Sequence, residues 1–212
     1  MTETIAGVEI PDTRLVREAT ELVRDAAPPL LFDHSRRVYL FGMLQGQHRG
    51  LRPSPELLYV GAMFHDLGLT QRYRTTTRRF ELDGAEEARA FLQKHGVDQD
   101  SVRRVWTGIA LHTTPGVPEF MEPEVALVTA GVETDVLGIG YHDLAPEAIA
   151  EVTDAHPRPD FKRQILAAFT EGFRDRPDTT FGTVNADVLE HFVPGFERID
   201  FVKVIQSNPW PE

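Results

Sequence analysis

Residues 55–70 read PELLYVGAMFHDLGLT, and this stretch contains the most clearly marked helix of the chain. Ser54 can cap the helix, Pro55 suits its first turn, and Glu56 suits the positive end of its dipole. The apolar run that follows is typical of a buried helix. We expect this helix to end near Gly68, which places an adjacent histidine and aspartate in its last turn.

Helical spacing of apolar residues recurs along most of the remaining sequence, and period-2 strand patterns are almost absent. Residues 1–12 are predicted to be a loose lead-in and residues 69–82 an ordered loop. Asp83 is expected to cap a helix, with Glu86 in the capping-box position. The predicted helices besides that at 55–68 are 13–26, 30–47, 83–95, 100–113, 123–137, 146–155, 161–173, 184–192 and a short one near 198–205.

These patterns predict the all-α class and a single domain over residues 1–212. The bundle core is expected at about 30–140, with an N-terminal helix at 13–26 and a C-terminal helical extension at 146–205. A chain of this length can bury a sizeable core without disulfides.

Four polar residues lie at inward or helix-end positions of the predicted bundle: His34, His65, Asp66 and Asp135. His34 shares a helical stripe with apolar residues, and Asp135 follows the inner stripe of its own helix. A buried carboxylate is costly unless it is paired or binds a metal. Imidazole nitrogen and carboxylate oxygen suit zinc, iron and manganese, so the four residues are predicted to bind one divalent ion.

Each of these residues also has a plain structural explanation when taken alone. A histidine on an apolar stripe is often a core residue bonded to the backbone, and an adjacent His-Asp pair often marks a helix end. Asp135 could pair with an arginine. The ordered set of four on separate helices favours the metal site over these explanations.

The arrangement H…HD…D on helices resembles the HD-domain superfamily of metal-dependent hydrolases. It is carried here by the segments FDHSRR, MFHDLGLT and GVETDVLG. Within that superfamily, the chain resembles the cyanamide hydratase group. The matching stretches are PELLYVGAMFHDLGLT, RFELDGAEEARAFL, VWTGIALHT and GVETDVLG, together with the later PDTTFGTVNADVL.

This resemblance implies a compact HD-domain helical bundle and a zinc-dependent addition of water to a nitrile carbon, which converts cyanamide to urea. Fe²⁺ or Mn²⁺ would also suit the ligand set. Asp66 is the candidate to bind the metal while accepting a proton, and the inward-facing His112 is the candidate to bond substrate or move a proton. A core histidine bonded to backbone is the alternative for His112. The sequence identifies no substrate-binding residue, although Phe64, Phe80 and Trp106 are candidates for the walls of a small apolar pocket.

Three alternatives remain open from the sequence. The first is an HD phosphohydrolase that acts on a nucleotide or a small phosphate ester, with arginines holding the phosphate. The second is a two-metal site, for which only His95 and His112 lie between the HD pair and Asp135. The third is a non-catalytic metal-binding sensor or assembly module. Arginines available for phosphate, or else exposed on a basic loop, are Arg36, Arg37, Arg72, Arg74, Arg78 and Arg79.

The composition of the chain limits the kinds of partner that we expect. A formal net charge of −11 argues against nucleic acid as a partner. The absence of cysteine excludes thiolate metal sites and disulfides. No secretory signal and no apolar run of membrane-spanning length are found, so we expect a cytoplasmic protein with a small-molecule substrate. Homo-oligomerisation stays open, with the terminal FVKVIQSNPWPE as one candidate surface.

Overall fold

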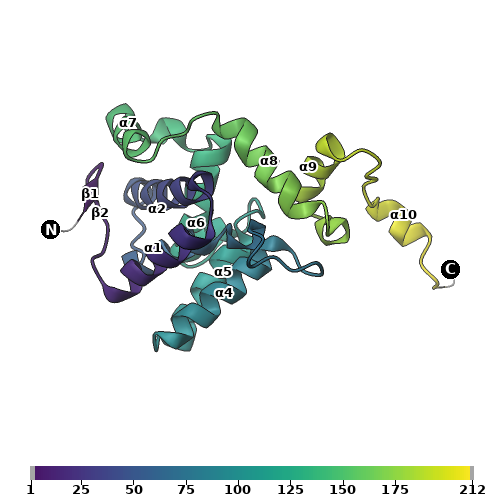
Figure 1. Ribbon diagram of the computed structural model, residues 1–212, viewed down its shortest axis with the longest axis horizontal. Coiled ribbons are helices and arrows are strands. Elements are labelled where there is room, and N and C mark those ends of the chain that lie inside the picture. Colours follow the sequence, from purple (N-terminus) through teal and green to yellow (C-terminus); the bar gives the residue numbers. More distant parts are fainter. Residues whose placement is uncertain (1–2, 211–212) are drawn as a thin grey trace.

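Helix α2, Pro29–Arg49, lies at the centre of the molecule and contacts α1, α3, α6, α7 and α8 (Figure 1). The computed structural model of the chain describes residues 3–210. More than half of the α2 side chains are buried, which is unusual for a helix that carries so many polar residues. A helix buried on most sides supplies a fixed frame for the polar groups that it carries.

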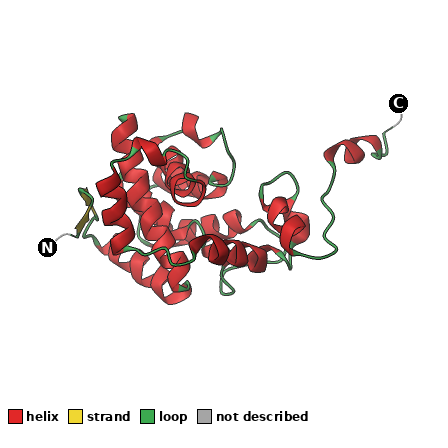
Figure 2. Ribbon diagram, turned by 90° about the horizontal axis from the view of Figure 1, so that it is seen from above, coloured by secondary structure: helices red, strands yellow, loops and turns green. Residues whose placement is uncertain are grey.

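The other helices follow the predicted pattern and confirm the all-α class (Figure 2). Thr13 caps α1, and Ser54 caps α3 as expected. The remaining α-helices in the described part of the chain are α1 (Arg14–Ala26), α3 (Pro55–Phe64), α4 (Phe80–Lys94), α5 (Gln99–Leu111), α6 (Pro123–Val132), α7 (Pro146–Ala155), α8 (Phe161–Phe173), α9 (Asn185–Phe192) and α10 (Phe201–Gln206).

Residues 3–12 are more ordered than predicted. Strands β1 (Thr4–Ile5) and β2 (Val8–Glu9) pair in antiparallel fashion, so that Thr4 faces Glu9. Ala6 and Gly7 form the turn with positive φ angles of 51° and 73°. Such a short hairpin leaves little period-2 signal in the sequence, which explains why the sequence suggested only a loose segment.

Two helix boundaries differ from the sequence-based expectation. Helix α4 begins at Phe80 rather than at Asp83, because Asp83 does not cap it but accepts hydrogen bonds from Thr75. The helix predicted over 123–137 changes after Val132 into a π-helix, Glu133–Leu137. Such wide turns insert an extra residue into a helix and occur often at functional sites.

Helices α2 and α6 approach each other closely at two glycines. A Cβ atom on Gly131 would lie 2.1 Å from the carbonyl oxygen of Val38, and one on Gly42 would lie 2.7 Å from that of Leu127. Both positions therefore require glycine, because the obstacle is backbone that has no rotamer to change. The close contact fixes the distance between the helix that carries His34 and the segment that carries Asp135.

The C-terminal helices pack on the bundle through a second apolar cluster. Phe161, Ile165 and Phe173 of α8 and Leu189 of α9 contact Leu31, Leu69 and Phe80 of the bundle. A buried ion pair adds to this contact, because Arg176 donates to Asp83 at 2.6 Å and to the carbonyl of Gly68. Helix α10 lies apart from these layers (Figures 1 and 2), with Phe201 64% exposed.

None of the helices within residues 3–210 combines the length and the apolar character that crossing a bilayer requires.

The close approach of α2 and α6 leads to a stability prediction. Gly131→Ala should lower the free energy of unfolding by about 3 kcal/mol, because the added methyl group collides with backbone. Gly108→Ala is the matched control, since its Cβ would lie 3.3 Å from the nearest atom, Val125 Cα. Urea unfolding of both variants measures the difference. Equal stability of the two variants would show that the helices can separate without cost.

Candidate metal centre

The centre is built where α2 and the end of α3 bring polar groups to one buried point. His34 lies in the second turn of α2. His65 ends α3, and Asp66 follows it with a backbone that has left the α-helical region. His34, His65 and Asp66 each offer a ligand atom within 4.8 Å of the other two, and all three are at most 2% exposed. Three of the four predicted metal ligands are thus brought together.

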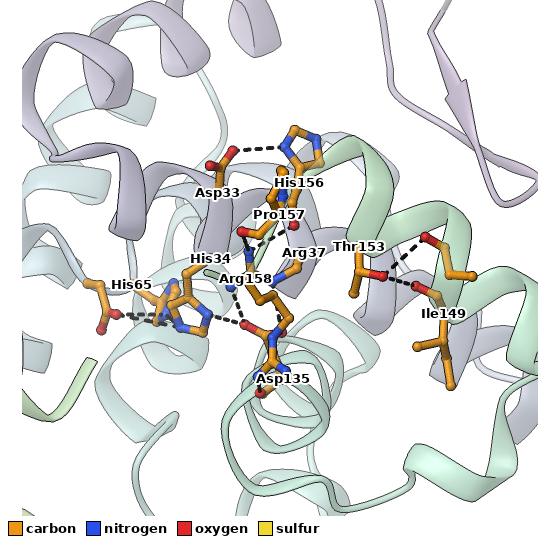
Figure 3. A network of polar contacts seen from close by, with 12 residues as sticks. Asp33, His34, Arg37, His65, Asp135, Ile149, Thr153, His156, Pro157 and Arg158 are labelled. Carbon is orange, nitrogen blue, oxygen red and sulfur yellow. Dashed lines mark hydrogen bonds and ion pairs between the residues drawn. The ribbon is translucent and has the colours of Figure 1, made fainter. Parts of the chain in front are cut away.

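When both rings are neutral, the two histidines point unprotonated nitrogens at each other. Nδ1 of His65 lies 2.7 Å from the carbonyl oxygen of Ala62, and Nδ1 of His34 lies 2.7 Å from Asp135 Oδ2 (Figure 3). Both partners accept, so each Nδ1 must carry the hydrogen. In the neutral rings the lone pairs are therefore on the Nε2 atoms, which are only 3.1 Å apart. A cation between them would remove the repulsion.

The carboxylate of Asp66 adds two more acceptors to the same space. Its Oδ2 lies 3.4 Å from Nε2 of His65 and 3.6 Å from Nε2 of His34. Neither oxygen has a hydrogen-bond partner, although both are buried. Buried polar atoms are nearly always satisfied, so an orphaned carboxylate indicates a missing positive group. The donor set of two imidazoles and a carboxylate fits a divalent metal ion.

His112 completes the acceptor surface around Asp66. It follows α5, is 4% exposed, and its Nδ1 lies 2.6 Å from the carbonyl oxygen of Ile109. Its Nε2 thus also carries a lone pair, 3.8 Å from Asp66 Oδ1. The inward direction predicted for His112 is confirmed by its burial. The backbone contact proposed as the plain alternative is present too, and it leaves the second ring nitrogen available.

Asp135 contacts the outer ring nitrogen of His34 and is not one of the three clustered residues. It receives His34 Nδ1 on Oδ2, while Arg37 donates to both of its oxygens at 2.9 Å and Arg158 approaches Oδ1 at 3.0 Å (Figure 3). The structure therefore shows Asp135 orienting the imidazole of His34, as acidic groups behind metal-binding histidines commonly do. Direct metal binding by Asp135 stays a prediction.

The electrostatics of the cluster favour a bound cation. Burial raises the pKa of Asp66, but the neighbouring imidazoles outweigh it and hold the pKa below its usual range. Burial lowers the pKa of His65, but the charge and hydrogen bond of Asp66, the carbonyl of Ala62 and the charge of Asp135 together raise it above its usual value. A proton on His65 is the smallest cation that satisfies the cluster, and a metal ion would displace it. Burial lowers the pKa of His112 to about 4, so this ring is neutral near pH 7.

A small cavity of about 160 Å³ opens directly onto the cluster. Its lining is mostly apolar and comes from three parts of the chain: the end of α5 and its following turn, the π-helix with the end of α6, and α8 with α9. The aromatic residue in its wall is Phe169, and the expectation for Phe64, Phe80 and Trp106 was wrong. The lining residues are His34, His65, Asp66, His112, Thr113, Pro115, Val132, Glu133, Val136, Leu137, Phe169, Val184, Asn185 and Val188.

The arginines named for a phosphate site or an exposed loop fall into two groups. Arg72 and Arg78 are exposed on the loop, whereas Arg36 is buried against Glu3, Tyr59 and His156. Arg37 is completely buried against Asp135, a pairing that sequence reasoning did not predict. Its position three residues after His34, on the same inward stripe, was the available signal. His95 pairs with Glu18 of α1, and it does not join the cluster.

Comparison with known families agrees with this geometry. The HD domain family matches residues 31–163, well over half of the chain. The chain belongs to the HD domain family. No curated protein sequence is detectably similar to it.

The HD domain match contains His34, His65, Asp66, His112 and Asp135. It indicates a metal-dependent hydrolase superfamily. Most of α8 and all of α9 lie beyond the match, although their side chains close one side of the cavity. The HD domain therefore provides the candidate metal ligands, and the segment that follows it provides part of the wall.

The orphaned carboxylate leads to a stability prediction. Asp66→Asn should bind less metal, because it removes the charged ligand. Without metal, the variant should melt at the same temperature as the original protein or higher, since the amide NH₂ can donate to the facing imidazoles. Thermal unfolding with chelator and with zinc, together with metal analysis, tests this. Unchanged metal content would refute Asp66 as a ligand.

Asp135→Asn is the matched contrast in the same experiment. It also replaces a carboxylate by an amide, but here the partners are buried donors. The metal-free variant should lose about 2 kcal/mol of stability, because Arg37 keeps only a neutral acceptor. Metal binding should weaken as well, through poorer alignment of His34 or loss of a ligand. Equal effects of the two variants on metal-free stability would contradict the different environments of the carboxylates.

Proposed function

We propose that the chain is a metal-dependent hydratase that adds water to a small neutral nitrile such as cyanamide and forms urea, in the cytoplasm and without a nucleic-acid or membrane partner. The observation that carries the proposal is the cavity of about 160 Å³ that ends at the candidate metal centre. A space of this size, equal to a few water molecules by volume, suits a substrate of only a few heavy atoms. The resemblance to the cyanamide hydratase group supports the same chemistry.

The charge of the lining favours a neutral substrate over a phosphate ester. No arginine or lysine in the described part of the chain lines the cavity. Two arginines that precede α4 form ion pairs with carboxylates of that helix: Arg79 pairs with Glu81, and Arg78 pairs with Asp83. A phosphate would meet Asp66 and Glu133 with no cation from the protein to offset its charge. The phosphohydrolase alternative has less support for this reason.

The chemistry requires a nucleophile and a route for two protons. His34, His65 and Asp66 would hold a divalent ion, which would supply an activated water as the nucleophile near neutral pH. We propose Zn²⁺ for this role, with Fe²⁺ and Mn²⁺ compatible with the same ligands. Adding water across the C≡N bond forms one C–O bond and moves one proton from oxygen to nitrogen, which gives isourea. A second proton that moves from the same oxygen to the same nitrogen gives urea.

The residues of the chain can hold the transferred protons in two places. His112 is neutral near pH 7, and its unprotonated Nε2 points to the space that Asp66 and the cavity share. It can accept a proton from oxygen and return it to nitrogen. Asp66 is the second candidate acceptor, since its carboxylate has two oxygens. The apolar wall excludes further water from the reaction.

Urea formation from cyanamide tests the proposed function. Purified zinc-loaded protein should produce urea, and Asp66→Ala should reduce the rate by more than about a hundredfold, since it removes a metal ligand and a proton acceptor. Arg198→Ala is the control, because Arg198 is half-exposed, pairs with Asp187 and does not line the cavity. Absence of urea from protein that holds stoichiometric metal would refute hydration of cyanamide.

His112→Ala separates proton transfer from metal binding. We expect kcat to fall by roughly 10²-fold or more, the usual contribution of a general acid–base group, while metal content stays unchanged. The pH profile of kcat should lose the step that reports ionisation of His112. Kinetics equal to those of the original protein would return His112 to a purely structural role.

A further inference from the structure

A carboxylate outside the metal centre organises the polar part of the cavity wall. Glu81 lies in the first turn of α4 and is completely buried. Its Oε1 accepts three hydrogen bonds, from Thr113 at 2.5 Å, from Asn185 Nδ2 at 3.0 Å and from Arg79 at 2.8 Å. These donors come from α4, from the turn after α5 and from α9. Glu81 itself does not line the cavity, so its role there is indirect.

The ionised state of Glu81 fixes the orientation of Asn185. Burial raises the pKa of Glu81, but the hydrogen bond from Arg79 and the neighbouring groups outweigh it, so the pKa lies below its ordinary value. An ionised carboxylate only accepts, and the Asn185 amide must therefore turn its NH₂ group toward it. The amide oxygen then points away from Glu81. It accepts no hydrogen bond from residues 3–210 and is not enclosed by them.

Asn185 and Thr113 are the neutral polar side chains in the cavity wall. Besides them, the polar lining consists of the metal cluster with His112, and of Glu133 at the rim, which also borders a neighbouring surface cavity. Thr113 donates its hydroxyl hydrogen to Glu81 and accepts a hydrogen bond from Arg79, so it too has no donor for the cavity. Among the described residues, these two neutral side chains of the cavity wall therefore present acceptors and no donor.

We propose that Asn185 is a specificity-determining residue that accepts a hydrogen bond from an N–H group of the ligand, and that Glu81 is the residue that positions it. The ligand class is a small neutral molecule with an NH₂ group beside the carbon that faces the metal centre. This inference rests on the proposed function for the reaction, but it concerns recognition. It also assigns recognition to α9, which lies outside the HD domain match.

Binding of two matched amides tests the inference without turnover. Zinc-loaded protein is titrated with acetamide, which has two N–H donors, and with N,N-dimethylacetamide, which has none, and the shifts are followed by ¹H–¹⁵N NMR. The original protein should prefer acetamide. Asn185→Leu should reduce this preference by about five- to tenfold, the usual effect of one hydrogen bond. Asn208→Leu, which makes the same change at an exposed residue that does not line the cavity, should leave the preference unchanged.

Glu81→Gln tests the positioning role. Its side-chain amide can donate, so the Asn185 amide is free to reverse and present its NH₂ to the cavity. The acetamide preference should fall although every cavity-lining side chain is retained. An unchanged preference in Glu81→Gln would remove the positioning role of Glu81. The melting temperature and the metal content of each variant establish that its fold and its metal centre are intact. Because the preference compares two ligands on the same variant, each variant serves as its own reference.

The outcomes separate this inference from the proposed function. An unchanged acetamide preference in Asn185→Leu, or no binding of acetamide to the original protein, would overturn the inference even if the protein formed urea from cyanamide. A preference that depends on Asn185 in a protein that forms no urea would support the inference and refute cyanamide hydration alone.

Discussion

The structure depends on a buried point where acceptors meet without a donor. His34 and His65 each donate their Nδ1 hydrogen to a fixed partner. In the neutral rings this leaves two Nε2 lone pairs, and the two Nε2 atoms are 3.1 Å apart. Asp66 adds a carboxylate with no partner of its own. Such an arrangement is costly in the interior of a protein unless a cation is present. The surrounding helices are rigid enough to maintain it, because their contacts are backbone against backbone at Gly42 and Gly131.

The second layer around this point explains why the imidazoles stay in place. Asp135 holds His34 through its outer ring nitrogen, and Arg37 holds Asp135 with two hydrogen bonds. Arg37 is fixed in turn by the carbonyl oxygens of His156 and Pro157, between α7 and α8. The orientation of one metal-binding ring therefore depends on contacts between segments more than 100 residues apart in the sequence.

Local signals predicted most of the fold and part of the site. Caps, prolines and apolar spacing located nearly every helix, and the helix ends at Thr13, Ser54 and Gly96 were marked by residue types with a physical preference for those positions. The ordered H…HD…D pattern located His34, His65 and Asp66. The prediction that Asp83 caps a helix was wrong, because a residue type that suits a helix start can equally form a buried ion pair, here with Arg176.

What the sequence did not reveal are pairings between distant segments. Arg37 lies 98 residues from Asp135 in the sequence, and Glu81 lies 104 residues from Asn185, and no local pattern encodes such a contact. The π-helix at Glu133–Leu137 was missed for a related reason, since its composition is that of an ordinary helix end. Tertiary contacts, rather than propensity, select these features.

The division of the cavity between two parts of the chain has an evolutionary consequence. The groups suited to chemistry lie within residues 31–163, whereas Val184, Asn185 and Val188 approach from α9. Substitutions in α9 can thus change which molecules fit while the metal ligands and their supports remain constant. Within a lineage, substitutions in this one short helix could change the substrate at little risk to the reaction itself. The diversity of such proteins would then concentrate in the segment that follows the shared domain.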